Sequence, residues 1–230
     1  MKRYKKIIIL ILIVMASLPM NTSGEIKEPP RPNVNKMFDA GKEEGINGLT
    51  GLSAQEVFEK LKTAEYLLNT DLAYKAVYKS FVARKQEGLN LAVAYLRSPL
   101  KEVVGDRVVS RLRDFTAAKR IFETFPEDAA LLLVPLYERS DVIMKGNIIQ
   151  AIGNVAGGEE IKKLLMRGLD DTSVYEEEDP DALGYPLRVC DLAYNQLVIR
   201  YNIRNVLRTI SPSHRTETRD YHIGVLKGML

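Results

Sequence analysis

Residues 144–171, "MKGNIIQAIGNVAGGEEIKKLLMRGLDD", hold two stretches with the apolar periodicity of a helix and a glycine pair between them. In the first stretch the apolar residues follow i, i+4, i+7, i+8 and i+11 spacing, at Met144, Ile148, Ala151, Ile152 and Val155. In the second they are Ile161, Leu164, Leu165 and Leu169. The pattern predicts a helical hairpin that turns at Gly157–Gly158, one of which should have a positive φ.

The same stretch partly matches a phosphate-binding loop. Gly153 and Gly158 have the G-x-x-x-x-G spacing, but Glu159 and Glu160 occupy the lysine and hydroxyl positions. Two carboxylates would repel a phosphate, whereas they stabilise the N-terminus of a helix through its dipole. A turn between helices is therefore favoured over nucleotide binding.

Residues 53–230 show helical periodicity almost throughout, without a convincing strand. Ser53 with Glu56 predicts a capping box, Asp71 is the expected cap of the next helix, and Pro135 predicts a kink or break. Eight or nine helices are expected, from helical stretches at 57–68, 72–85, 88–98, 105–125, 126–139, 140–156, 159–169, 186–202 and 216–230. Such short helices with wide apolar faces are typical of stacked hairpins.

Residues 144–171 resemble the bacterial HEAT-like repeat that also occurs in phycobilin lyases. That repeat has the form V-R-x-x-A-x-x-A-L-G-x-I, followed by a leucine-rich helix that ends at L-x-D. Met144-Lys145, Ala151-Ile152-Gly153, Val155 and Leu169-Asp170-Asp171 stand at the motif positions. A second match starts at Val189, with Ala193, Leu197 and Cys190 in place of arginine. The resemblance implies an all-α fold, an α-α superhelix or short HEAT-like solenoid, that is used mainly for protein–protein contact. Spacings of 40 and 45 residues between Leu112, Ile152 and Leu197 suit two-helix repeats.

An acidic insertion at 172–185 interrupts the repeat. It is read as a partner-binding or cation-binding loop, or as a solvated acidic loop. Its spacing fits no EF-hand, although a calcium-stabilised module remains an alternative. The partner-binding candidates in and around it are Tyr175, Glu176, Glu177, Glu178, Asp179, Tyr185, Arg188 and Tyr194.

The N-terminus has the organisation of a secretory signal peptide. Four basic residues precede the apolar run at 7–20, and small residues lead to a cleavage site near Gly24. An uncleaved membrane anchor is the alternative. We expect a signal peptide at 1–24, a flexible linker at 25–52 and a repeat domain at 53–230 in a periplasmic or secreted protein.

Removal of residues 1–24 changes the charge of the chain. It leaves 29 of the 33 basic residues against 30 acidic ones, a net charge of −1. A nearly neutral chain without tryptophan gives little support for nucleic-acid binding. The basic residues at 111–120 are read as a solvated helix face.

Candidate catalytic groups are few. Cys190 lies on an apolar helix face and is expected to be a buried, inert thiol. His214 and His222 are read as two surface histidines, with a weak metal site as the alternative if they are ordered together near Asp220. G-x-S-x-G is missing from the sequence. The aromatic side chains Tyr194 and Tyr201 are read as packing residues or as a lining of the concave surface.

The expected function is a non-enzymatic scaffold that binds a protein or peptide partner in the cell envelope. No catalytic residues, metal or cofactor are assigned, and membrane contact is expected only through an uncleaved signal segment. The alternative is an envelope enzyme or enzyme accessory with Arg188, Asp191, His214 or His222 in the groove.

Overall fold

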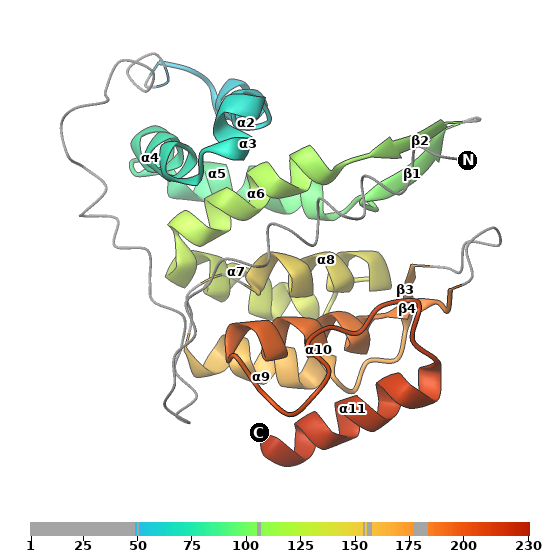
Figure 1. Cartoon of the computed structure of the whole chain (residues 1–230). Coiled ribbons are helices and arrows are strands. Elements are labelled where there is room, and N and C mark those ends of the chain that lie inside the picture. The colour runs from blue at the N-terminus through green and yellow to red at the C-terminus, as the bar shows by residue number, and fades with distance from the viewer. Residues whose placement is uncertain (1–48, 50, 105–106, 154, 156–157, 177–183) are drawn as a thin grey trace.

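The computed structural model describes residues 49, 51–104, 107–153, 155, 158–176 and 184–230. The expected signal peptide, nearly all of the linker, and Gly157 and Glu177–Asp179 lie outside these residues. The described elements, labelled as in Figure 1, are α2 (Ala54–Leu61), α3 (Ala64–Leu68), α4 (Thr70–Phe81), α5 (Lys85–Leu96), β1 (Lys101–Val104), β2 (Arg107–Ser110), α6 (Leu112–Thr124), α7 (Pro126–Tyr137), α8 (Val142–Ile152), α9 (Glu159–Gly168), β3 (Val174–Glu176), β4 (Leu187–Arg188), α10 (Val189–Arg200) and α11 (Thr216–Met229). The mostly helical fold is confirmed.

The ends of the first helices follow local capping chemistry. The capping box of α2 is present, because the Ser53 amide donates to Glu56 Oε2 at 2.8 Å and the Glu56 amide donates to Ser53 Oγ at 3.3 Å. The prediction that Asp71 caps the next helix is wrong. That helix begins at Thr70, and Asn69 Oδ1 accepts from the Leu72 amide at 3.0 Å.

Two short antiparallel hairpins correct the expectation that the domain has no strands. In the first, Lys101 pairs with Ser110 and Val104 with Arg107, so the helix expected from residue 105 begins only at Leu112. Each strand holds two adjacent valines, at 103–104 and 108–109, and valine favours strands. The second hairpin joins β3, inside the acidic insertion, to β4.

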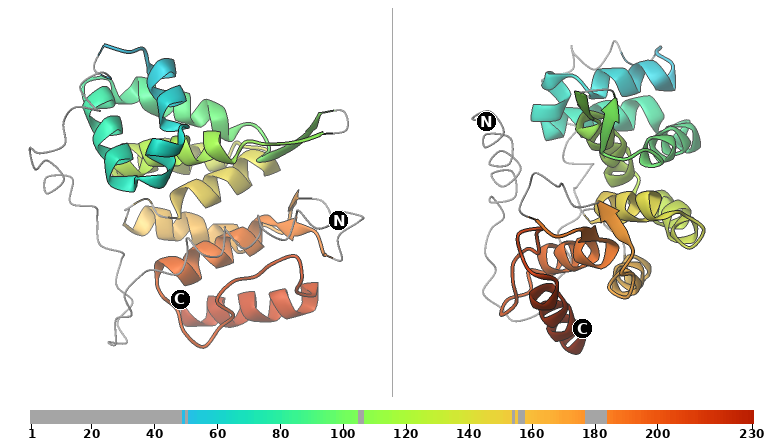
Figure 2. Two further views of the ribbon diagram at one scale, coloured as in Figure 1. Left: turned by 45° about the horizontal axis from the view of Figure 1, so that its top comes forward. Right: turned by 90° about the vertical axis from the view of Figure 1, so that its right-hand side faces the viewer.

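Six of the described helices pack in two rows. Helices α4, α6, α8 and α10 contact one another in that order, while α7 and α9 contact each other behind them (Figures 1 and 2). The core between the rows is continuous and includes Phe122, Leu133, Ile148, Leu165 and Leu197. Pro135 lies two residues before the end of α7, so it does not break that helix.

Gly153, at the end of α8, acts through packing, whereas Gly158, just before α9, has open space around it. Glu159 begins α9 after α8 has ended at Ile152, so the two helices are separate, as predicted. A positive φ is expected at Gly157 or Gly158: it is not found at Gly158, whose φ is −70°, and Gly157 lies outside the described residues. Gly153 is needed for another reason: a Cβ there would lie 1.6 Å from Oε1 of Gln196. Its missing side chain lets α8 approach α10 closely.

The last two helices, α10 and α11, do not form an antiparallel hairpin with each other. The N-terminal ends of α10 and α11 lie together, because Asp191 and Arg219 form an ion pair. Residues 201–215, which we call the return segment, therefore run back along α10 before α11 begins (Figure 1). Within the described parts of the chain, the helices are all too short or too polar to cross a bilayer.

Candidate functional site

The return segment has an unusual charge composition. It holds three arginines, Arg204, Arg208 and Arg215, and neither aspartate nor glutamate. Its backbone turns at Asn202 and Asn205, whose φ values are 49° and 71°. Asparagine tolerates this left-handed conformation better than most residues with a side chain. The sequence therefore permits tight turns after α10.

Side chains of α10 hold the return segment in place. The Tyr194 hydroxyl donates to the Leu207 carbonyl at 2.6 Å. Asn195 forms a pair of hydrogen bonds with the backbone of Ile210, donating to its carbonyl at 2.8 Å and accepting from its amide at 2.6 Å. Burial raises the pKa of Tyr194 to about 12, so the hydroxyl remains a donor at neutral pH. The segment also accepts a hydrogen bond near its far end, where the Tyr185 amide donates to the Pro212 carbonyl at 2.8 Å.

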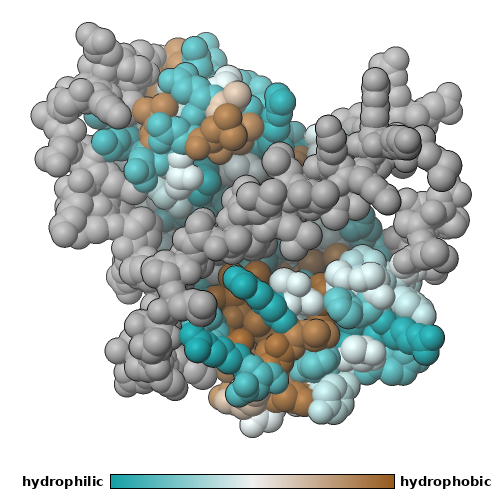
Figure 3. Space-filling model, in the orientation of Figure 1, coloured by the Kyte–Doolittle hydropathy of each residue, from teal (hydrophilic) through white to brown (hydrophobic). Residues whose placement is uncertain are grey.

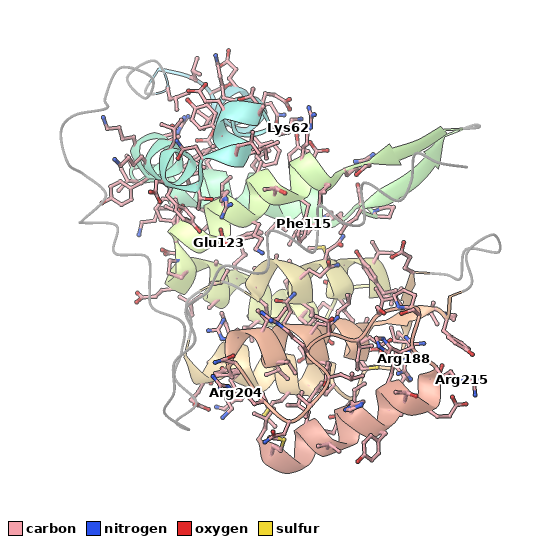
Figure 4. All side chains as sticks on the ribbon, in the orientation of Figure 1. Lys62, Phe115, Glu123, Arg188, Arg204 and Arg215 are labelled. Carbon is pink, nitrogen blue, oxygen red and sulfur yellow. The ribbon has the colours of Figure 1, made fainter. Side chains whose placement is uncertain are left out.

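The outer side of the segment combines basic and apolar groups. Arg204 and Arg208 are exposed, and Val206 and Leu207 between them are half-buried against the core. Figure 3 shows an apolar area on the part of the surface where α10 and the return segment lie, bordered by hydrophilic residues. Figure 4 labels Arg204, near the start of the return segment, and Arg215, its last residue. A surface of this kind can bind an anionic group beside an apolar one.

Beneath the segment, the N-terminal ends of α10 and α11 share a buried charge cluster. Asp191 is fully buried and accepts from Arg219 Nη1 at 2.5 Å and from Arg188 Nη2 at 3.0 Å. Arg188 also donates to Asp220 at 2.7 Å, and Arg219 to the Pro186 carbonyl at 2.9 Å. Two guanidinium groups thus compensate one buried carboxylate. We call Asp191, Arg188 and Arg219 the buried cluster.

Cys190 adjoins this cluster and is buried, as expected. Burial and the neighbouring Asp191 carboxylate raise the pKa of the thiol to about 11. The thiol is therefore protonated at neutral pH, where a cysteine nucleophile would need to be a thiolate.

A second charged cluster joins α4 to α6 (Glu123 in Figure 4). Glu123 is 4% exposed and accepts from the Tyr74 hydroxyl and from Arg120 Nη1, both at 2.8 Å. Burial, with the Glu123 carboxylate, raises the pKa of Tyr74, and burial lowers the pKa of Lys119. The basic residues at 111–120 are thus only partly a solvated face, since Arg120 and Lys119 form ion pairs with Glu123.

Tyr175, the first partner-binding candidate, is buried rather than displayed. A Cβ at Gly146 would lie 2.0 Å from its ring, so the ring rests directly on α8. Its hydroxyl donates to Asn147 Oδ1 at 2.6 Å and accepts from Gln150 at 3.1 Å. The Asn147 amide in turn donates to the Leu96 carbonyl at 2.7 Å. Tyr175 therefore links the insertion to two helices.

The other candidates divide by burial. Arg188 and Tyr194 are buried in the contacts described above, so their positions do not suit direct contact with a partner. Tyr185 is exposed, and Glu176 is half-buried. His214 and His222 do not form a metal site: within the described residues, no group of three or more potential metal ligands occurs. Sequence reasoning missed the return segment, although its arginines and lack of acidic residues were visible.

Comparison of the chain with protein-family models, with curated proteins and with solved structures gives no match. Its function is therefore inferred from the geometry of its own residues.

Proposed function

We propose that the chain is an exported HEAT-like α-solenoid that binds a protein or peptide partner through the return segment, without catalysis. The observation that carries the proposal is the return segment itself. Tyr194 and Asn195 fix its backbone, while Arg204 and Arg208 extend from it into solvent. A loop that is ordered by a rigid helix and presents charged side chains is a common form of binding site.

The order of the helices supports a solenoid. Successive helices of the front row contact one another, and each connection from α6 to α9 adds a helix to the opposite row. A repeat array buries its core in this way and leaves one long face of each row for ligands. The antiparallel hairpin pattern ends at α10, so the return segment occupies the place where a further repeat would begin.

The surroundings of the ionisable groups favour binding over catalysis. An enzyme site with Arg188 and Asp191 would need at least one of them accessible to substrate, whereas both are buried in ion pairs. Cys190 is kept as a thiol by its high pKa. Arg188 and Asp191 thus already have structural partners.

Site-specific photo-crosslinking tests the proposal. A photoreactive amino acid replaces exposed Thr209 in the return segment, and a control variant carries it at exposed Arg139, after α7. We expect one reproducible protein adduct in the envelope fraction of the native host, formed from position 209 and not from 139. Equal adducts from both positions, or none from position 209, would reject binding through this segment.

Mass analysis of the exported chain would show whether cleavage occurs near Gly24.

A further inference from the structure

We infer that acid loosens the return segment, because the two histidines of the chain, His214 and His222, bind its backbone only while they are neutral. This pH switch concerns the order of the segment and does not rest on the binding of a partner. It follows from the ring nitrogen that each histidine uses and from the place of its hydrogen bond in the segment.

Both histidines contact the segment through the same ring nitrogen. Nδ1 of His214 accepts from the Ser211 amide at 3.1 Å, and Nδ1 of His222 accepts from the Leu207 amide at 3.5 Å. A backbone amide only donates, so Nδ1 carries no proton in either ring and the hydrogen of the neutral imidazole is on Nε2. A protonated imidazole donates from both nitrogens. Protonation therefore replaces each acceptor with a second donor that faces an amide N–H.

The two hydrogen bonds lie where the segment is fixed to the helices. The Leu207 carbonyl accepts from Tyr194 of α10, and its amide donates to His222 of α11, so this residue is held from both helices. The second amide follows Ile210, which is bonded to Asn195 of α10. Protonation of His222 thus removes the bond between Leu207 and α11, while the bonds to α10 remain.

The two rings differ in their neighbours once they are protonated. Ser211 Oγ lies 3.0 Å from Nδ1 of His214 and can accept the new proton, because it can donate its own to Ser213 Oγ at 2.7 Å. The Tyr221 ring packs edge-on against His222, with 5.2 Å between the ring centroids. A hydroxyl next to His214 can therefore compensate part of its lost bond. We expect His222 to be the more disruptive of the two when it is protonated.

The charged groups on the elements around the rings affect the pH of the transition. Carboxylates favour a protonated imidazole and cations oppose it. The direction of the transition follows from the Nδ1 bonds alone, since only a neutral ring accepts from an amide. The charged groups of these elements are Arg204, Arg208 and Arg215 in the segment, Asp191 and Arg200 on α10, and Glu217, Arg219, Asp220 and Lys227 on α11.

An NMR titration of the isotope-labelled, purified chain tests the switch without a mutation. Histidine is the side chain that ordinarily changes its charge between about pH 8 and about pH 5. We expect the amide signals of Leu207 and Ser211 to move upfield over this range, each with the midpoint of the imidazole that it contacts. The amide of Ile148, inside α8, is the reference and should not move with them. Amide signals that stay in place, or that follow a midpoint different from that of either ring, would overturn the inference.

Hydrogen exchange, corrected for the pH dependence of the intrinsic rate, measures the order of the whole segment. From about pH 8 to about pH 5.5, protection in residues 201–215 of the unchanged chain should fall by about two- to tenfold. The variant His214→Asn/His222→Asn has side-chain oxygens that accept at both pH values, so its protection should change by less than about twofold. An equal fall in this variant, or no fall in the unchanged chain, would overturn the inference. Crosslinking from position 209 at about pH 8 reports partner binding separately, so the switch and the proposed function can fail independently.

Discussion

Two pairs of arginines, all within residues 188–219, differ in their surroundings: one pair is buried and the other is exposed. Arg188 and Arg219 are buried against Asp191, whereas Arg204 and Arg208 are exposed on the return segment. For the first pair, the fold itself supplies the carboxylate. For the second, the segment that carries them contains no acidic residue. The same type of side chain thus joins helices in one place and is exposed on the surface in the other.

The difference has an energetic basis. A buried guanidinium group has lost its water, so removal of its carboxylate leaves an uncompensated charge. An exposed guanidinium group keeps its water, and its loss changes the folded and unfolded states almost equally. Disruption of the buried pair should therefore lower stability more than loss of the exposed pair does. Loss of the exposed pair should in turn weaken partner binding more than disruption of the buried pair does.

The largest effect is expected for Asp191→Ala. This change leaves Arg188 and Arg219 buried without their shared carboxylate, and it should lower the free energy of unfolding by about 3–5 kcal/mol. Urea denaturation of the purified chain gives the value. Asp220→Ala is the matched control, because Asp220 is 56% exposed although it also pairs with Arg188; its loss should be about 0–1 kcal/mol. Similar losses for both variants would show that burial does not distinguish these carboxylates.

Arg200 sharpens the comparison, since it is buried but bonded to carbonyl groups. Its Nη1 donates to the Val155 carbonyl at 2.7 Å and also approaches the carbonyls of Ile152 and Gly153, at the end of α8. Arg200→Met keeps an apolar stem but removes these bonds, and should lower the free energy of unfolding by about 1.5–3 kcal/mol. The exposed control Arg167→Met, which breaks an ion pair with Glu138, should change it by about 0–1 kcal/mol. A smaller loss at Arg200 than at Arg167 would contradict a capping role.

The helices were predictable because their information is local. Apolar residues at helical spacing placed α8, α9 and α10, and the motif of Ser53 and Glu56 placed the start of α2. The apolar face also identified Cys190 as buried. The first hairpin was missed because each strand has only four residues, too few for a strand pattern to stand out from the helical pattern around it.

The buried cluster and the position of the return segment depend on contacts between residues that are distant in sequence. Asp191 and Arg219 are separated by 28 positions, and nothing in their local sequence indicates that they pair. Tyr194 could be placed on the apolar face of its helix, but its hydroxyl bonds to Leu207, 13 residues later. The packing role of Gly153 likewise depends on Gln196. These relations require the fold to be known.

A smaller effect on stability is expected for Tyr194→Phe. The ring keeps its packing, while the Leu207 carbonyl loses its donor, so the free energy of unfolding should fall by about 0.5–1.5 kcal/mol. Hydrogen exchange followed by mass spectrometry should show faster exchange in the return segment and unchanged exchange in α8. Tyr185→Phe is the control, because its backbone amide, rather than its exposed side chain, contacts the segment. Unchanged exchange in the return segment of Tyr194→Phe would show that this hydrogen bond does not order it.

The smallest effect on stability is expected for Arg204→Ala/Arg208→Ala, which returns the comparison to the exposed pair. Both side chains extend into solvent, so the free energy of unfolding should stay within about 0.5 kcal/mol of the unchanged chain. The same variant should nevertheless lose most of the partner adduct formed by a photoreactive group at position 209. Asp191→Ala, studied at a temperature where it is folded, should keep more of that adduct than this variant does. If removal of the exposed arginines instead destabilised the chain as strongly as Asp191→Ala, these side chains would have a structural role within the fold. The assignment of the return segment as a binding surface would then fail.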